Sequence, residues 1–213
     1  PSTSRGEGVD PPRWPPRGSW PVQLRLRGHT SAAYVAVEGW REASLRSCPE
    51  HGRGRCDFTR HGTYGRVRPA GTRIARYYCR TGRRTYSLLP DFLSSHLSGE
   101  LDEVEALVAA VESAPSVSAA LAGLRPEVEL PGVARWVRRR RARVAAALLA
   151  LVTLMPEALG PRPTVLALRG RLGTERALVK LRELGEVHLQ KLPTPLGFAP
   201  PGRGVRSRGS ARQ

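Results

Sequence analysis

Residues 48–90 read CPEHGRGRCDFTRHGTYGRVRPAGTRIARYYCRTGRRTYSLLP, and the fold of the N-terminal half can be inferred from this segment. Within it, residues 62–69, 73–79 and 84–88 are short runs rich in β-branched and aromatic side chains, which favour strands. The tripeptide Pro69-Ala-Gly71 between the first two runs is typical of a turn. This segment is therefore predicted to form short strands joined by turns.

Two segments before residue 48 extend the β-rich region. Residues 22–27 (VQLRLR) alternate strictly between apolar and polar side chains, which is the pattern of a half-buried strand. Residues 34–37 (YVAV) are a second, shorter β-prone run. The sequence thus predicts a small β-rich domain over residues 22–90.

From Leu101 onward the spacing of apolar residues changes to about 3.6, the period of a helix. Acidic residues soon after it support a helix N-terminus, with Ser98 or Gly99 as the cap. Three further helices are predicted, over residues 116–124, 133–155 and 165–189, the last with possible breaks at Gly170 and Gly173. The predicted fold class is therefore α+β, with a β-rich unit followed by an all-helical domain over residues 91–198.

Five potential metal ligands fall within residues 48–79. They are Cys48, His51, Cys56, His61 and Cys79. Tetrahedral zinc needs four thiolate or imidazole ligands, and close pairs with two or four intervening residues can supply them. Gly82 stands where a second C-x-x-C pair would close, so zinc would need the three cysteines with either His51 or His61. The alternative is that the cysteines are buried free thiols and the histidines lie in turns or on the surface.

Four short phrases in this region resemble a known family. They are CP at 48–49, HGTYGR at 61–66, RYYC at 76–79 and RTYSLLP at 84–90. In order and spacing they are similar to the zinc-ribbon head at the N-terminus of bacterial insertion-sequence transposases, from which Gly82 departs. The resemblance implies a zinc-ribbon fold, bound zinc and, after the ribbon, a DNA-binding helix-turn-helix.

Residues 116–143 also resemble a transposase helix-turn-helix. Ala119, Ala120 and Ala122 would permit close helix crossing, and Trp136 is predicted to lock the second helix against the first. The second helix would contact base edges or nearby phosphates through Arg135, Arg138 and Arg139. It would contact the DNA backbone through Arg140, Arg141 and Arg143. The alternative is a basic, solvated face on a core helix.

The charge distribution points to a polyanionic partner. The net charge is +17, with +9 over residues 41–90, −6 over residues 99–130 and +13 over residues 131–213. Two basic blocks therefore flank an acidic one, and the acidic helix is predicted to face away from the partner. In the first block, phosphate contacts are predicted for Arg66, Arg68, Arg73, Arg76, Arg83 and Arg84.

The two ends of the chain and its longest apolar run bear on where in the cell the protein is expected. Residues 1–21 and 199–213 are rich in proline, glycine, serine and arginine, which predicts disordered tails. The chain shows no basic-then-apolar leader, and its three cysteines do not suggest a disulfide scaffold. The apolar run at residues 144–155 is shorter than the ~20 residues needed to span a bilayer, which predicts a core helix. A cytoplasmic, nucleoid-associated protein without membrane contact is expected.

Catalytic patterns are missing from the sequence. No aspartate follows Asp102, so the acidic residues of a transposase nuclease are absent, and no phosphate-binding glycine loop or G-x-S-x-G motif occurs. The expectation is a non-catalytic protein that binds nucleic acid, in particular duplex DNA. The alternative is an accessory protein of a mobile element or of an RNA–protein complex. Its helical half would bind a protein partner or a second copy of itself, with apolar positions at Leu166, Leu168, Leu172, Leu178, Leu181 and Leu184.

Overall fold

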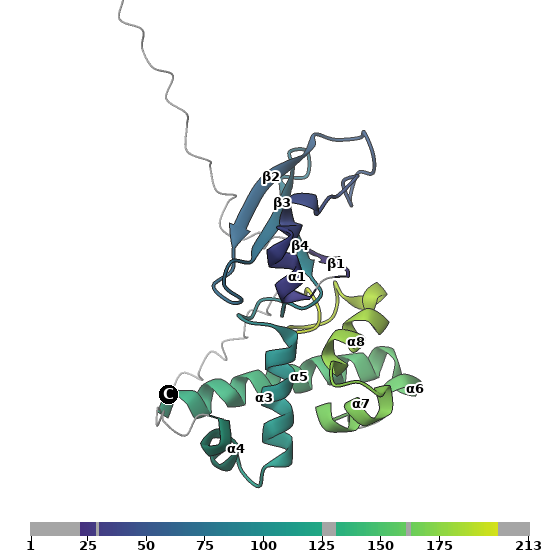
Figure 1. Ribbon diagram of the computed structural model, residues 1–213. Helices are drawn as coiled ribbons and strands as arrows, with labels where there is room; N and C mark the ends of the chain where they lie inside the picture. Colours follow the sequence, from purple (N-terminus) through teal and green to yellow (C-terminus); the bar gives the residue numbers. More distant parts are fainter. Residues whose placement is uncertain (1–21, 29, 125–130, 161–162, 200–213) are drawn as a thin grey trace, which may run out of the picture.

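The computed structural model describes residues 22–28, 30–124, 131–160 and 163–199, so the predicted tails lie outside the described residues, apart from Ala199. The fold is α+β, as predicted (Figure 1). In chain order the elements are β1 (Val22–Leu26), α1 (Ser31–Ala36), α2 (Gly39–Glu42), β2 (Phe58–Gly65), β3 (Arg73–Cys79), β4 (Arg84–Pro90), α3 (Leu101–Ser113), α4 (Val117–Leu124), α5 (Pro131–Leu154), α6 (Pro156–Leu159), α7 (Val165–Leu172), α8 (Ala177–Leu184) and a 3-10 turn (Glu186–His188).

The four strands form one mixed sheet in the order β1-β4-β3-β2. The pairs β2–β3 and β3–β4 are antiparallel, whereas β1 lies parallel to β4, with Val22 opposite Tyr86. Strands were predicted at all four places, but β2 starts at Phe58 and ends at Gly65, before the predicted end. A register shift between Arg60 and Gly62 marks a bulge in this strand.

The prediction of a β-prone run at residues 34–37 was wrong, because Tyr34 to Ala36 belong to helix α1. The Thr30 hydroxyl caps the helix by accepting a hydrogen bond from the Ala33 N–H at 3.3 Å. Tyr34 is fully buried, with its ring edge-on to Trp40 and Phe92. A cap and tertiary packing thus outweigh the strand propensity of the run.

The helices differ from their predicted bounds mainly at their ends. The N-cap of α3 is Glu100 rather than Ser98 or Gly99, and it forms a capping box with Glu103. The predicted helix over 165–189 is divided into α7, α8 and the 3-10 turn. Gly173 ends α7 in the left-handed conformation, as expected of a breaker, whereas Gly170 lies within the helix.

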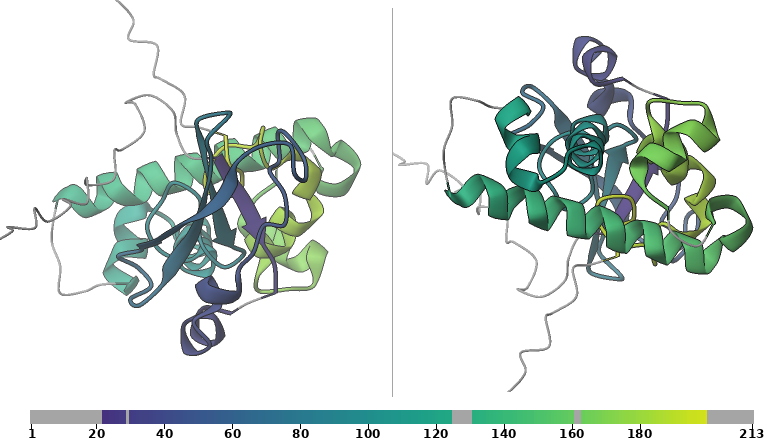
Figure 2. Two further views of the ribbon diagram at one scale, coloured as in Figure 1. Left: turned by 90° about the horizontal axis from the view of Figure 1, so that it is seen from above. Right: turned by 90° about the horizontal axis from the view of Figure 1, so that it is seen from below.

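One large core joins the sheet to the helices. It contains Tyr34, Ile74 and Leu89 from the N-terminal half together with Leu151 and Leu178 from the helices. Packing therefore continues across residue 90, where the sequence suggested a division between two domains. Figure 2 shows α5 running along one side of the molecule beneath the sheet. The predicted core helix at 144–155 is its C-terminal half, with Val144, Ala147, Leu148 and Leu151 buried.

Arg182 of α8 connects the C-terminal segment to the loop between β4 and α3. Its side chain is fully buried. Its guanidinium donates hydrogen bonds to the carbonyl oxygens of Asp91, Leu93, Pro195 and Leu196. Burial lowers its pKa to about 9, although the charge of Asp91 acts in the opposite direction. This side chain therefore joins α8 to two segments distant from it in the sequence.

The acidic helix α3 is tied to the rest of the helical layer through its carboxylates, and the expectation that it faces away from a polyanionic partner stays a prediction. Glu105 is fully buried and accepts hydrogen bonds from the N–H groups of Ala177 and Leu178 at the start of α8. About two turns further along α3, Glu112 accepts hydrogen bonds from the N–H groups of Val165 and Leu166 at the start of α7. The acidic charges thus cap two neighbouring helices.

Candidate metal centre and arginine surface

Four of the five predicted metal ligands come together at one end of the sheet. Cys48, His51 and Cys56 lie in the loop at residues 44–57, which we call the metal loop, and Cys79 is the last residue of β3. A tight turn, in which the Gly52 N–H donates to the Cys48 carbonyl at 2.8 Å, brings the first two together. The ligand atoms of all four residues lie within 4.8 Å of one another, close enough to hold one metal ion.

The distances within this cluster suit a tetrahedral site. His51 Nδ1 lies 3.4 Å from Cys48 Sγ and 3.4 Å from Cys79 Sγ. Zinc–sulfur and zinc–nitrogen bonds of normal length, at tetrahedral angles, would place sulfur and nitrogen about 3.5 Å apart. Three sulfur atoms and one imidazole nitrogen are also a common donor set for structural zinc. The cluster is therefore compatible with zinc.

Gly82 departs from the ribbon pattern for a structural reason. A Cβ atom at this position would lie 2.8 Å from a carboxylate oxygen of Glu50 and 3.3 Å from the His51 ring. The glycine instead donates its N–H to Cys79 Sγ at 3.2 Å. A side chain at this position would crowd the His51 ring, and His51 offers the fourth donor atom that the pattern assigns to a second cysteine of the pair.

The thiols of the cluster respond differently to their surroundings. Burial opposes ionisation of Cys48, but hydrogen bonds from His51 and from neighbouring groups outweigh it and lower the pKa to about 6. Desolvation and the neighbouring sulfur atoms of Cys48 and Cys79 raise the pKa of Cys56 to about 12. The closeness of the other two sulfur atoms thus disfavours ionisation of Cys56, and a bound cation would relieve this repulsion.

His61 lies apart from the other four candidates. It is exposed on β2, and its ring centroid is 5.6 Å from that of Tyr78. Of the two histidines that the sequence left open as the fourth ligand, the structure places His51 in the cluster.

The predicted arginine contacts of the first basic block have unequal surroundings. Arg66 donates to the carbonyl oxygens of Ser94 and Leu97, and burial lowers its pKa. Arg84 forms an ion pair with Glu50 at 2.6 Å. Arg73 donates to the Thr63 hydroxyl, and the guanidinium of Arg76 lies 5.6 Å from the Tyr64 ring centroid. Arg68 and Arg83 are exposed.

Helix α5 carries six arginines and no acidic residue along its 24 residues. Five are exposed, and we call them the α5 arginine face: Arg135, Arg138, Arg139, Arg141 and Arg143. None of these five makes an ion pair within the part of the chain that the structure describes. They are therefore available to an anionic partner.

Arg140 was predicted to contact the DNA backbone, and the structure contradicts this. Its side chain is only 8% exposed, and it donates two hydrogen bonds to Ser98. The buried positions Val137, Arg140 and Val144 follow a helical spacing, so the sequence pattern itself could have shown that this arginine lies on the inner face.

The predicted helix-turn-helix corresponds to α4 and α5, although residues 125–130 between them lie outside the described residues. A small cluster of Val111, Ala120 and Val137 joins α3, α4 and α5. The prediction that Trp136 locks the two helices together was wrong, because Trp136 is 41% exposed and Arg140 lies over its ring. Val137 takes that position instead.

Further exposed arginines surround the metal loop, and the sequence interpretation did not single them out. They are Arg46, Arg53, Arg55 and Arg80. The sequence signal was present, because two of them flank Gly54 immediately before Cys56. Figure 1 shows the loop before β2 at the end of the sheet remote from α5, so these side chains form a second basic region.

Comparisons with protein-family models, with curated proteins and with solved structures find no match to this chain. Among the described segments, none of the helices combines the length and apolar character that crossing a bilayer requires. The features of the described residues that bear on function are the metal cluster and the α5 arginine face.

Proposed function

We propose that this protein is a non-catalytic nucleic-acid-binding protein that binds duplex DNA through the α5 arginine face. The observation that carries the proposal is that five exposed arginines on one helix have no acidic neighbour along that helix. Arginine pairs well with phosphate because its planar guanidinium offers several fixed donors. A surface of this kind favours a polyanion over a small neutral substrate.

The placement of α5 supports a duplex as the partner. Its C-terminal half is anchored in the core by Val144, Leu148 and Leu151, so its arginine-bearing half is held on a rigid support. An α-helix with its side chains is about 10–12 Å in diameter, which matches the major groove of B-DNA, about 12 Å wide. Arg135, Arg138 and Arg139 share one stripe, because they are three and four residues apart.

The metal cluster has a structural role in this proposal, with zinc as its occupant. Cys48, His51, Cys56 and Cys79 would hold the ion, which when bound supplies a crosslink between the metal loop and β3. The small core beside it includes Ala75, Tyr77, Tyr86 and Leu88. Such a limited core benefits from a crosslink, which would hold the arginines of the metal loop in place as a second phosphate contact. The resemblance to transposase DNA-recognition heads agrees with this arrangement.

The test is the affinity for duplex DNA after Arg135→Gln, Arg138→Gln and Arg139→Gln are combined. Loss of three phosphate contacts should lower affinity about 100-fold at about 0.15 M salt and reduce the slope of log K against log salt by about 2.7. Fluorescence anisotropy with duplex DNA, single-stranded DNA and duplex RNA, each at several salt concentrations, measures both quantities.

Two controls separate a specific surface from total charge. Combined Arg27→Gln, Arg41→Gln and Arg176→Gln removes the same charge from arginines that are already paired with Glu186, Glu38 and Asp102. This variant should bind almost as well as the wild type. Combined Arg135→Lys, Arg138→Lys and Arg139→Lys keeps the charge and loses the forked donors, so it should keep the salt slope and lose less affinity than the glutamine triple at the same positions. Equal losses from the two glutamine triples would contradict the α5 assignment, and tighter binding to RNA would contradict the choice of DNA.

A further inference from the structure

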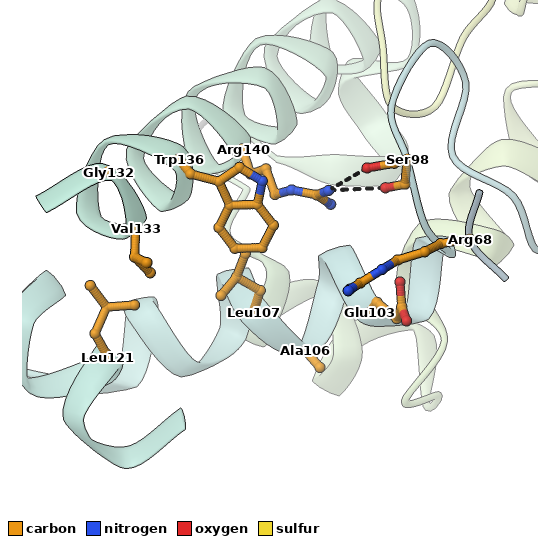
Figure 3. A pocket seen from close by; sticks show the side chains of 10 residues that line it. All are labelled: Arg68, Ser98, Glu103, Ala106, Leu107, Leu121, Gly132, Val133, Trp136 and Arg140. Carbon is orange, nitrogen blue, oxygen red and sulfur yellow. Dashed lines mark hydrogen bonds between the residues drawn. The ribbon is translucent and has the colours of Figure 1, made fainter. Parts of the chain in front are cut away.

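A cavity of about 610 Å³ lies between α3, α4, α5 and the loop that follows β2. Figure 3 shows that its two ends differ in character. One end is lined by apolar side chains, those of Leu107, Leu121, Val133 and Trp136. The other is lined by Arg68, Ser98, Glu103 and Arg140. Concave sites of this size, with apolar walls and a few convergent polar groups, are typical of small-ligand pockets.

Arg140 is the central polar group of this cavity. Its side chain is more than nine-tenths buried, and Nη2 donates to the Ser98 carbonyl oxygen at 2.9 Å and to its hydroxyl at 3.2 Å. Its buried Nε has no hydrogen-bond partner among the residues that the structure describes. A buried, charged donor of this kind is costly to leave unsatisfied. The cavity is therefore lined by a guanidinium whose hydrogen-bonding capacity is only partly used.

The charges around Arg140 leave the polar end of the cavity positive. Arg68 adds a second guanidinium, and Arg143 contributes a third positive charge nearby. The one carboxylate in the lining, Glu103, already accepts a hydrogen bond from the Glu100 N–H at the start of α3. Burial, together with the charges of Arg68 and Arg143, lowers the pKa of Arg140, and Glu103 offsets this only in part.

We propose that this cavity is a binding site for a small amphipathic carboxylate. The carboxylate would pair with Arg140 and Arg68, and an aromatic or aliphatic body would contact Leu107, Leu121 and Trp136. A neutral molecule of the same shape would leave the two guanidiniums unpaired. The site lies on the inner side of α5, and it goes beyond the proposed binding of DNA by the outer side.

The test uses 2-naphthoate as the probe and 2-naphthamide as its neutral counterpart, with the full chain and without nucleic acid. Isothermal titration calorimetry should show one naphthoate site per chain. Its affinity for naphthoate should exceed that for the amide about tenfold or more, because one charge-assisted hydrogen bond is lost with the amide. Quenching or enhancement of the Trp136 fluorescence, identified with a Trp136→Phe variant, would place the probe in the cavity.

Variants of the cavity lining separate the contributions of the charged residues and of the cavity volume to binding of the two probes. Arg140→Met should reduce the preference for naphthoate over the amide to about threefold, the share contributed by Arg68. Arg68→Gln, which changes an exposed side chain, should weaken naphthoate about threefold and leave the amide unchanged, even if the Arg140 variant folds poorly. Ala106→Phe fills the cavity from α3 and should prevent binding of both probes.

Arg80→Gln is the matched control, because it removes an exposed arginine beside the metal loop instead of one at the cavity. It should leave both affinities unchanged. The proposal is overturned if neither probe binds at millimolar concentration, if both bind equally well, or if Arg68→Gln and Arg80→Gln have the same effect. Because no nucleic acid is present, these outcomes are independent of the DNA-binding test.

Discussion

Replacing His51 by alanine is expected to lower the affinity for zinc by more than about 100-fold, since loss of a ligand should exceed the 10–100-fold effect typical of an outer-shell partner. The His51 ring nitrogen lies 3.4 Å from both Cys48 Sγ and Cys79 Sγ, and its removal leaves only three donor atoms in the cluster. The metal loop should then lose its crosslink to β3. Zinc content after dialysis and competition with a chromogenic chelator measure the affinity.

His61→Ala is the matched control for this prediction. It removes a histidine ten residues further on, which is exposed on β2 and lies outside the cluster. This variant should keep one zinc ion per chain and the wild-type melting temperature. Chelation should lower the melting temperature of the wild type and of His61→Ala, but not that of His51→Ala. Zinc loss from His61→Ala with retention by His51→Ala would contradict the ligand assignment.

Replacing Glu105 by alanine is expected to lower the free energy of unfolding by about 3–5 kcal/mol, the typical cost of removing one partner from a buried ion pair. Its carboxylate is fully buried, pairs with Arg169 at 2.8 Å and accepts the first N–H groups of α8. Removal would leave those donors without their partner. Urea unfolding followed by circular dichroism measures the change.

Glu112→Ala provides a graded comparison on the same helix. Glu112 also caps a helix, by accepting hydrogen bonds from Val165 and Leu166, but it is only partly buried. Its replacement should cost about 1 kcal/mol, the usual value for loss of a cap. Equal effects of the two substitutions would show that burial of Glu105 does not determine its contribution. The loss in free energy of unfolding for Glu105→Gln should lie between the losses for Glu105→Ala and Glu112→Ala, because glutamine keeps the shape of the side chain and loses its charge.

Much of the secondary structure could be predicted because its signals are local. The alternation at residues 22–27 corresponds to β1, and the 3.6-residue spacing from Leu101 corresponds to α3. Tyr34 is different, because its side chain packs against Trp40 and Phe92, which lie elsewhere in the chain. Strand propensity could not predict the helix there, since the Thr30 cap and these tertiary contacts together outweigh it.

The candidate sites were likewise predictable in part, where their signals are local, and in part only from the tertiary structure. Close spacing of Cys48, His51 and Cys56 restricted the possible metal ligands, because a short loop can direct only nearby side chains to one point. The choice of His51 over His61 required the position of Cys79, which β3 brings to the loop from 28 residues beyond His51. Net charge likewise indicated a polyanionic partner without showing which arginines can reach it.

The sequence by itself determined the α+β class, the positions of the four strands and of α3, the set of possible metal ligands and the excess of positive charge. These properties follow from composition and from periodicities over a few residues. Only the tertiary structure decided that Arg140 bonds Ser98 at the wall of a cavity, and that Glu105 caps α8. Burial and choice of partner depend on groups distant in the chain, so they are settled only when the core of sheet and helices assembles.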